Sequence, residues 1–157
     1  MNEQLSENES LPEEESLPER PKVSVTAEVH ASLPDVWEAW VTPGAIQAWN
    51  FAVDEWCCPE AEIDLQPGGK FRYRMESRDG AAGFDFAGTF TRIDPHRALA
   101  FDLGDQRNVQ VEFTETPDGV QVSETFEAED ENSAEQQRHG WQRILNNFKR
   151  YVEEQGK

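Results

Sequence analysis

The chain has 157 residues, of which 32 are acidic and 14 are basic, and its net charge is −18. This length fits one domain with a real core, and the charge argues against nucleic-acid binding, which needs clustered lysine and arginine. No apolar run approaches the roughly 18 residues of a membrane helix, and the acidic start lacks the features of a signal peptide. We therefore expect a cytoplasmic protein without membrane insertion.

Residues 1–20 differ from the rest of the chain in composition. They hold seven glutamates and one arginine, no aromatic residue, and the sequence Ser-Leu-Pro-Glu twice. Too little apolar surface is present to offset the entropy lost on ordering, so we predict a disordered acidic tail before a single domain over residues 21–157. The repeat is alternatively a docking motif. The acidity of the domain itself suits either a high-salt cytoplasm or an ordinary acidic protein.

The domain begins with a strand and two short helices. Apolar and polar residues alternate over residues 23–29, which predicts a strand with one buried face. Ser32 is a typical N-cap for a short helix that continues to Val41. A second short helix is predicted from Pro43 to Trp49, because proline is favoured at the first helical position.

The middle of the chain is a series of strand patterns separated by turns. Residues 67–69 (Pro-Gly-Gly) and 79–80 (Asp-Gly) are turn signals, and Gly88 is placed where a bulge or bend is expected inside a strand. The antiparallel strands are expected over residues 61–65, 71–76, 83–93, 98–103, 107–115 and 120–129.

One long helix is predicted from Ser133 to Glu154. Ser133 and Gln136 have the spacing of a capping box. Apolar residues recur every three or four positions, which predicts one apolar stripe along the helix. The stripe comprises Ala134, Trp141, Ile144, Leu145, Phe148 and Val152.

Two residues of this helix are unusual for a core helix. Gly140 lies in mid-helix, where glycine costs roughly 1 kcal/mol relative to alanine. Gln137 lies about 40° from Trp141 around the helix, so a polar amide points with the apolar stripe. Either the helix borders a space, or Gly140 lets a strand approach closely and Gln137 lies at the wet end of the core.

Few residues suggest metal binding or catalysis, and no cofactor, metal or catalytic residue is predicted. Cys57 and Cys58 are adjacent, which suits a soft metal or a vicinal disulfide, but two reduced structural thiols are favoured. Asp85 lies between two phenylalanines of a strand, so its side chain is expected on the opposite, solvent face. The histidines, which show no metal-site spacing, are His30, His96 and His139.

The order of elements predicts an α+β fold in which a curved antiparallel sheet of six to seven strands wraps around the long C-terminal helix. This order resembles the Bet v 1/START-like (SRPBCC) superfamily with its helix-grip fold, and more closely the family similar to activator of Hsp90 ATPase homologue 1. The resemblance covers roughly residues 22–152. It implies a fold and no single activity, since the superfamily includes lipid and hormone binders, polyketide cyclases and chaperone regulators. The matching positions are Val36, Trp37, Trp49, Trp56, Asp64, Leu65, residues 67–69, Phe71, Tyr73, Met75, residues 79–80, residues 83–88, Pro95, Gly140 and Trp141.

Large aromatic residues from separate elements are expected to converge between sheet and helix. Aromatic side chains with polar tips suit a cavity for an apolar ligand, although they also fill the core of a small curved sheet. The predicted ligand-binding residues are Trp49, Phe51, Trp56, Tyr73, Met75, Phe86, Gln137, Trp141 and Ile144.

Three functions are compatible with this fold and its expected cavity. We predict binding of a small hydrophobic or aromatic molecule. The first alternative is a cofactor-free enzyme of the cyclase or hydratase kind, with Asp85, Tyr73 or an arginine as acid or base. The second is a module that binds a chaperone-like protein partner by analogy with the resembling family, although the chain lacks a basic patch for an acidic partner.

Overall fold

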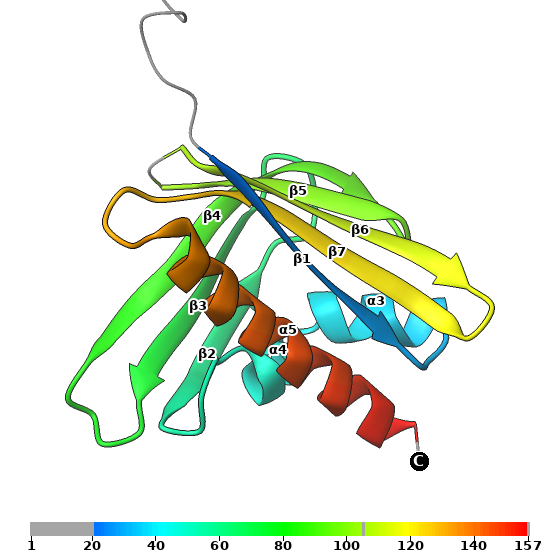
Figure 1. Ribbon diagram of the computed structural model, residues 1–157, viewed down its shortest axis with the longest axis horizontal. Coiled ribbons are helices and arrows are strands. Elements are labelled where there is room, and N and C mark those ends of the chain that lie inside the picture. Colours follow the sequence, from blue (N-terminus) through cyan, green and yellow to red (C-terminus); the bar gives the residue numbers. More distant parts are fainter. Residues whose placement is uncertain (1–20, 105, 157) are drawn as a thin grey trace, which may run out of the picture.

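The computed structural model describes residues 21–104 and 106–156, so the predicted acidic tail lies outside the described residues. A seven-stranded sheet curls around one long helix (Figure 1), which confirms the predicted helix-grip fold. The elements are β1 (Lys22–Val29), α3 (Leu33–Val41), α4 (Pro43–Trp49), β2 (Trp56–Ile63), β3 (Lys70–Ser77), β4 (Gly83–Asp94), β5 (Ala98–Leu103), β6 (Asn108–Thr116), β7 (Gly119–Glu127) and α5 (Ala134–Gln155).

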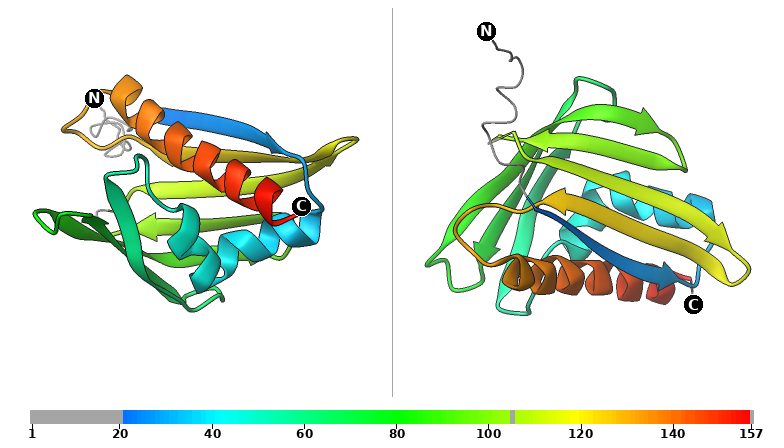
Figure 2. Two further views of the ribbon diagram at one scale, coloured as in Figure 1. Left: turned by 90° about the horizontal axis from the view of Figure 1, so that it is seen from below. Right: turned by 45° about the horizontal axis from the view of Figure 1, so that its top comes forward.

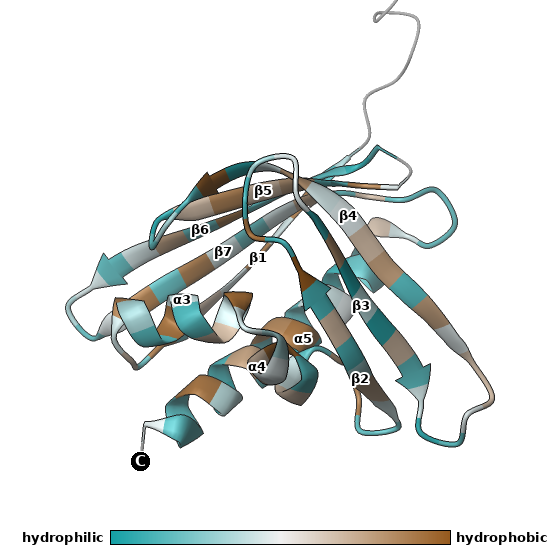
Figure 3. Ribbon diagram, turned by 180° about the vertical axis from the view of Figure 1, so that it is seen from behind, coloured by the Kyte–Doolittle hydropathy of each residue, from teal (hydrophilic) through white to brown (hydrophobic). Residues whose placement is uncertain are grey.

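The strands lie in the order β1-β7-β6-β5-β4-β3-β2, and every neighbouring pair is antiparallel. Strands β2 to β7 therefore follow one another as a meander, and β1 joins the far edge by pairing with β7. Because side chains alternate along a strand, hydrophilic and hydrophobic bands alternate along β2, β3 and β4 (Figure 3). The apolar side chains of each strand gather on the concave face, which holds the core.

Helix α5 lies along β1, on the concave side of the sheet (Figure 2). The predicted capping box is present, since the Ser133 hydroxyl and the Gln136 amide each bind the other's backbone N–H. Further along the helix, Gln142 donates to the carbonyl of Thr26 at 3.0 Å, and Lys149 donates to that of Glu28 at 2.6 Å. These bonds hold the helix to the edge strand. No helix within the described residues is both long and apolar enough to cross a membrane.

The two short helices fill the space beside the C-terminal half of α5. Ser32 caps α3 by accepting a hydrogen bond from the Asp35 N–H, as the sequence predicts. On the buried side, the rings of Trp40, Trp49 and Phe148 pack with centroids 4.8–5.0 Å apart. An aromatic cluster therefore joins α3, α4 and α5.

Two details of the sheet differ from the sequence prediction. Strand β2 begins at Trp56 instead of residue 61, and its pairing with β3 shifts register between Cys57 and Glu60, around Pro59. A shift of this kind accommodates proline in an edge strand, because proline has no N–H to donate. The prediction therefore placed the start of β2 too late.

Of the bulge or bend predicted at Gly88, the bulge lies elsewhere. The register of β4 against β5 shifts between Phe90 and Arg92, whereas pairing is regular at Gly88. Gly88 instead serves close packing, since a Cβ at this position would lie 2.5 Å from the carbonyl oxygen of Asp102 and 2.9 Å from the Phe71 ring. The glycine lets two neighbouring groups approach the backbone.

Candidate functional site

A cavity of about 190 Å³ lies between the concave face of the sheet and the helices. An engineered apolar cavity of about 150 Å³ is large enough to bind benzene, so this one has room for a single small ring compound. Fourteen described side chains line it: Trp40, Trp49, Asn50, Ile63, Tyr73, Met75, Phe84, Phe86, Phe90, Leu99, Phe101, Glu124, Trp141 and Ile144.

One wall of the cavity is an aromatic surface on β3 and β4. Tyr73 and Met75 lie two positions apart on β3, and their antiparallel partners on β4 are Phe86 and Phe84. All four side chains therefore face the same side of the sheet. The rings of Tyr73 and Phe86 are stacked, with centroids 6.3 Å apart and an interplanar angle of 25°.

Helix α5 supplies the opposite wall through Trp141 and Ile144, which lie three positions apart on one helix face. The Trp141 ring stacks on Phe126 of β7 with centroids 3.9 Å apart and an angle of 11°. Its edge meets Phe86 of β4, with centroids 6.1 Å apart and an angle of 75°. Trp141 therefore bridges two distant strands across the cavity.

The inner end of the cavity is formed by α3, α4 and the residue after α4. The indole N–H of Trp49 donates to the carbonyl of Ala39 at 2.9 Å, so it is already satisfied. The side-chain amide of Asn50 makes a long contact of 3.5 Å with the Met75 sulfur, which is a weak acceptor. Asn50 is therefore a polar group with remaining hydrogen-bonding capacity at this end.

The one carboxyl group in the cavity belongs to Glu124 of β7. It follows Val120 and Val122 at every second position on the concave face, and only 6 % of its surface is exposed. Among residues 21–104 and 106–156, no group donates a hydrogen bond to this carboxyl. Burial raises the pKa of Glu124 to about 8, because removal from water disfavours the charged form.

Tyr73 is the other ionisable residue of the cavity wall. Burial raises the pKa of its phenol above the ordinary value, with a smaller contribution from Cys58. The hydroxyl is therefore neutral at physiological pH, and it is available as a hydrogen-bond donor or acceptor.

The structure brings six of the nine predicted binding residues to the cavity wall. These are Trp49, Tyr73, Met75, Phe86, Trp141 and Ile144. Phe51 and Trp56 are not among the lining residues. The guanidinium carbon of Arg78 lies over the Phe51 ring, 5.7 Å from the centroid of that ring. Trp56 packs on Phe84 with ring centroids 6.0 Å apart.

Gln137 does not line the cavity either. It is buried, but its amide accepts a hydrogen bond from the Glu129 N–H at 2.9 Å and donates to the carbonyls of Glu129 and Asn132 at 3.1 and 2.8 Å. Gln137 thus ties down the loop between β7 and α5. Of the two interpretations of this residue, the position at the polar end of the core is the one that the structure supports.

Sequence analysis missed the remaining lining residues: Trp40, Asn50, Ile63, Phe84, Phe90, Leu99, Phe101 and Glu124. For Glu124 a signal existed, because an acidic residue at a position that the alternating pattern assigns to the buried face is unusual. The others occupy apolar or polar positions that look the same whether they border a cavity or a solid core.

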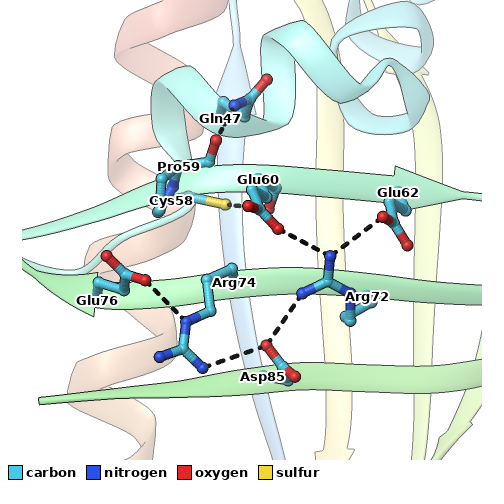
Figure 4. A network of polar contacts seen from close by, with 9 residues as sticks. All are labelled: Gln47, Cys58, Pro59, Glu60, Glu62, Arg72, Arg74, Glu76 and Asp85. Carbon is cyan, nitrogen blue, oxygen red and sulfur yellow. Dashed lines mark hydrogen bonds and ion pairs between the residues drawn. The ribbon is translucent and has the colours of Figure 1, made fainter.

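Asp85 lies outside the cavity, on the solvent face of the sheet, as predicted from the strand alternation. Its carboxylate is 3.3 Å from a guanidinium nitrogen of Arg72 and 3.4 Å from one of Arg74 (Figure 4). Arg72 also pairs with Glu60 and Glu62. These groups form a surface ion-pair network across β2, β3 and β4, which removes Asp85 from any chemistry in the cavity.

Neither of the adjacent cysteines takes part in a disulfide; Cys58 is buried and Cys57 is half-buried. Burial raises the pKa of Cys58 to about 11, so this thiol is protonated and unreactive at neutral pH. Within the described part of the chain, no three His, Cys, Asp or Glu residues gather as a metal site would require.

Comparison with known proteins places the chain in a family. The family model of activator of Hsp90 ATPase homolog 1-like proteins matches residues 30–153. An AHSA1-like protein from Aeromonas hydrophila, solved by NMR, is 45 % identical over 87 % of this chain and 94 % of its own, with a TM-score of 0.83.

Two further solved structures extend the comparison. A protein from Cytophaga hutchinsonii is 38 % identical over 87 % of this chain and 93 % of its own, with a TM-score of 0.71. A protein of unknown function from Staphylococcus aureus shares the fold at 20 % identity over 88 % and 96 % of the two chains, with a TM-score of 0.70. None of the curated proteins matches the sequence significantly. Since the family model spans most of the domain, the chain belongs to the family of activator of Hsp90 ATPase homolog 1-like proteins.

Proposed function

We propose that the protein binds one small apolar or aromatic molecule in the cavity between the sheet and α5. The observation that carries this proposal is the cavity of about 190 Å³ with walls made mostly of aromatic side chains. Natural ligand sites are concave and apolar, with a few polar groups that orient the ligand. Asn50, Tyr73 and Glu124 are suited to that orienting role. Burial of the ligand's apolar surface supplies affinity at roughly 25 cal/mol per Å².

Access to the cavity is supported by Phe84. This side chain lines the cavity and is 51 % exposed, so the cavity reaches the surface beside it. Phe84 lies near the start of β4, where its ring packs on Trp56 of β2. A ligand can enter there by displacing exposed side chains, without any change in the sheet.

Tryptophan fluorescence gives a direct test, because Trp40, Trp49 and Trp141 all line the cavity. Small aromatic compounds that neither absorb nor emit in the tryptophan bands, such as toluene and benzyl alcohol, are titrated against the wild type and against Ile144→Trp, which fills the cavity. We expect the wild type to bind at least one compound with a Kd below about 100 µM, equivalent to about −5.5 kcal/mol. Ile144→Trp should abolish that binding while the circular dichroism stays native.

Asn146→Trp is the matched control, since it adds the same ring at an exposed position of α5. It should leave binding unchanged. If no compound binds, and Ile144→Trp unfolds the protein where Asn146→Trp does not, then the cavity is too small for a ligand and the proposal is wrong.

A second candidate is the cofactor-free enzyme, and the observation that favours it is that the buried carboxyl of Glu124 and the phenol of Tyr73 line the same cavity. A pair of this kind can act as acid and base on a bound molecule. Turnover of any compound that binds, lost in Glu124→Gln with binding retained, would distinguish this candidate from simple binding.

The interaction module is the weakest candidate. The name of the family refers to the Hsp90 ATPase, but Phe84 is the only large hydrophobic side chain exposed in the described part of this chain. A stable docking surface usually needs a larger apolar centre. Binding of a chaperone-like partner and the cytoplasmic location both stay predictions.

A further inference from the structure

We propose that the molecule bound in this cavity is a compact aromatic or alkyl amine, whose ammonium group pairs with the carboxylate of Glu124. The inference rests on the proposed binding function and specifies its chemical class. The fold buries the Glu124 carboxyl, and no other described residue donates a hydrogen bond to it.

Among the residues that the structure describes, nothing around Glu124 compensates a carboxylate. Its neighbours in the sheet are Val25 of β1 and Val111 of β6, both buried. On the helix side, the lining residues are Trp141 and Ile144 of α5. Buried polar groups in proteins are almost always hydrogen-bonded, so an orphan carboxyl that lines a cavity indicates a partner from outside the chain.

The charged groups of the cavity wall indicate which ligand charge the cavity favours. None of its described lining residues is lysine, arginine or histidine, and the only ionisable group besides Glu124 is the neutral phenol of Tyr73. An anionic ligand would find no counter-charge and would meet a carboxyl group. A ligand without any polar group would leave that carboxyl unpaired, and a neutral hydroxyl would pair with it without supplying a counter-charge. An ammonium group supplies both a positive charge and up to three N–H donors.

The aromatic side chains of the cavity walls also favour a cationic ligand. The face of an indole ring carries negative charge and attracts cations, and tryptophan is the most effective side chain in this interaction. Three tryptophans line the cavity, together with Tyr73 and several phenylalanines. The protein's net charge of −18 further attracts cations from solution and repels anions.

Protonation makes the binding dependent on pH in a defined direction. Burial holds the pKa of Glu124 near 8, so below this pH the carboxyl of the free protein is mostly protonated. Forming the ion pair with an ammonium ion then requires the carboxyl to release its proton to solvent. The affinity for an amine should therefore rise about tenfold per pH unit from about pH 6 to 8 and level off above.

The test uses three ligands of similar size that differ in charge: phenethylamine, phenethyl alcohol and hydrocinnamate. Calorimetric titration at about pH 8 compares the wild type with Glu124→Gln and with Glu112→Gln. Glu112 is an exposed residue of β6, so its substitution makes the same chemical change without touching the cavity.

We expect the wild type and Glu112→Gln to bind phenethylamine at least about tenfold more tightly than the alcohol, and hydrocinnamate most weakly. Glu124→Gln should lose that preference while its affinity for the alcohol stays within about threefold. Its amine affinity should also be independent of pH. If Glu124→Gln fails to fold, the pH dependence of the wild type alone carries the test.

Each other outcome contradicts the inference. Equal affinity for amine and alcohol, with no pH dependence, overturns the amine class and leaves the binding function standing. Tighter binding of hydrocinnamate than of phenethylamine also overturns the amine class and leaves the binding function standing. If none of the three ligands, nor any neutral compound of the fluorescence panel, binds to the wild type, the proposed function itself fails.

Discussion

The two ends of the space beneath α5 are built from the same kinds of residue but packed differently. At the filled end, beside the C-terminal half of α5, Val36, Phe148 and Val152 are almost completely buried. Trp37 there meets Phe113 edge to face at 5.4 Å. At the open end, Tyr73 and Phe86 face Trp141 and Ile144 across the cavity.

The difference between these ends lies in the layer that covers the sheet. Helices α3 and α4 lie against the sheet beside the C-terminal half of α5, and their side chains fill that end (Figure 2). No helix lies as closely along β3 or β4 in the described part of the chain: the backbone of α5 follows β1, and α5 reaches β4 through the Trp141 ring. The cavity lies where β3 and β4 face the helices across a gap, and its walls are mostly apolar.

The largest expected effect concerns Glu124, the acid of the open end. Its folded pKa of about 8 lies above the ordinary 4.5, so the folded state binds more protons than the unfolded state between these values. The contribution of Glu124 to the free energy of unfolding is fully present below about pH 4.5 and is lost as the pH rises through 8. The total loss is about 5 kcal/mol, because each unit of difference between the two pKa values is worth about 1.4 kcal/mol.

Urea unfolding of the wild type and Glu124→Gln across this range measures that loss as a difference between the two proteins. The wild type should be destabilised relative to the variant as pH rises. A constant difference would show that the carboxyl has a partner or access to water.

Phe148→Ala tests the filled end. Phe148 is fully buried between Trp40 and Trp49, so truncation should leave a cavity and cost roughly 3–5 kcal/mol of unfolding free energy. Chemical denaturation measures the cost. A loss below about 1 kcal/mol would mean that this end is not solid.

Trp141→Ala tests the open end in the same way. Trp141 stacks on Phe126 but borders the cavity on another side, so its truncation removes fewer contacts. We expect the free energy of unfolding to fall by about 2 kcal/mol. The two ends are compared by the difference between the losses of unfolding free energy in Trp141→Ala and in Phe148→Ala. Equal losses would contradict the distinction between a filled and an open end.

Gly140→Ala should give the smallest effect, a gain of about 1 kcal/mol, because alanine is the better helix former. A Cβ at Gly140 meets nothing within 4 Å, so neither a strand nor the cavity wall requires glycine there. Thermal unfolding should show a raised Tm. Gly88→Ala is the contrasting control, since its Cβ would lie 2.5 Å from the Asp102 carbonyl oxygen and should lower the Tm.

The local elements could be predicted from the sequence because their signals act over a few residues. The capping box of Ser133 and Gln136, the helix start at Pro43 and the strand alternation each depend on neighbours within one turn or one pleat. Together with the order of the elements, they sufficed for the helix-grip fold and for six of the predicted cavity residues.

The cavity itself was decided by the tertiary structure. Gln137 and Trp141 lie close together on one helix face, yet the first binds the loop after β7 and the second borders the cavity. Glu124 interrupts an apolar alternation, but only the packing of β1, β6 and α5 around it shows that no described residue pairs with its carboxyl. Periodicity determines which face a side chain takes, because the backbone repeats locally. What meets that face depends on elements distant in the chain, and no local repeat encodes whether they fill the space or leave it open.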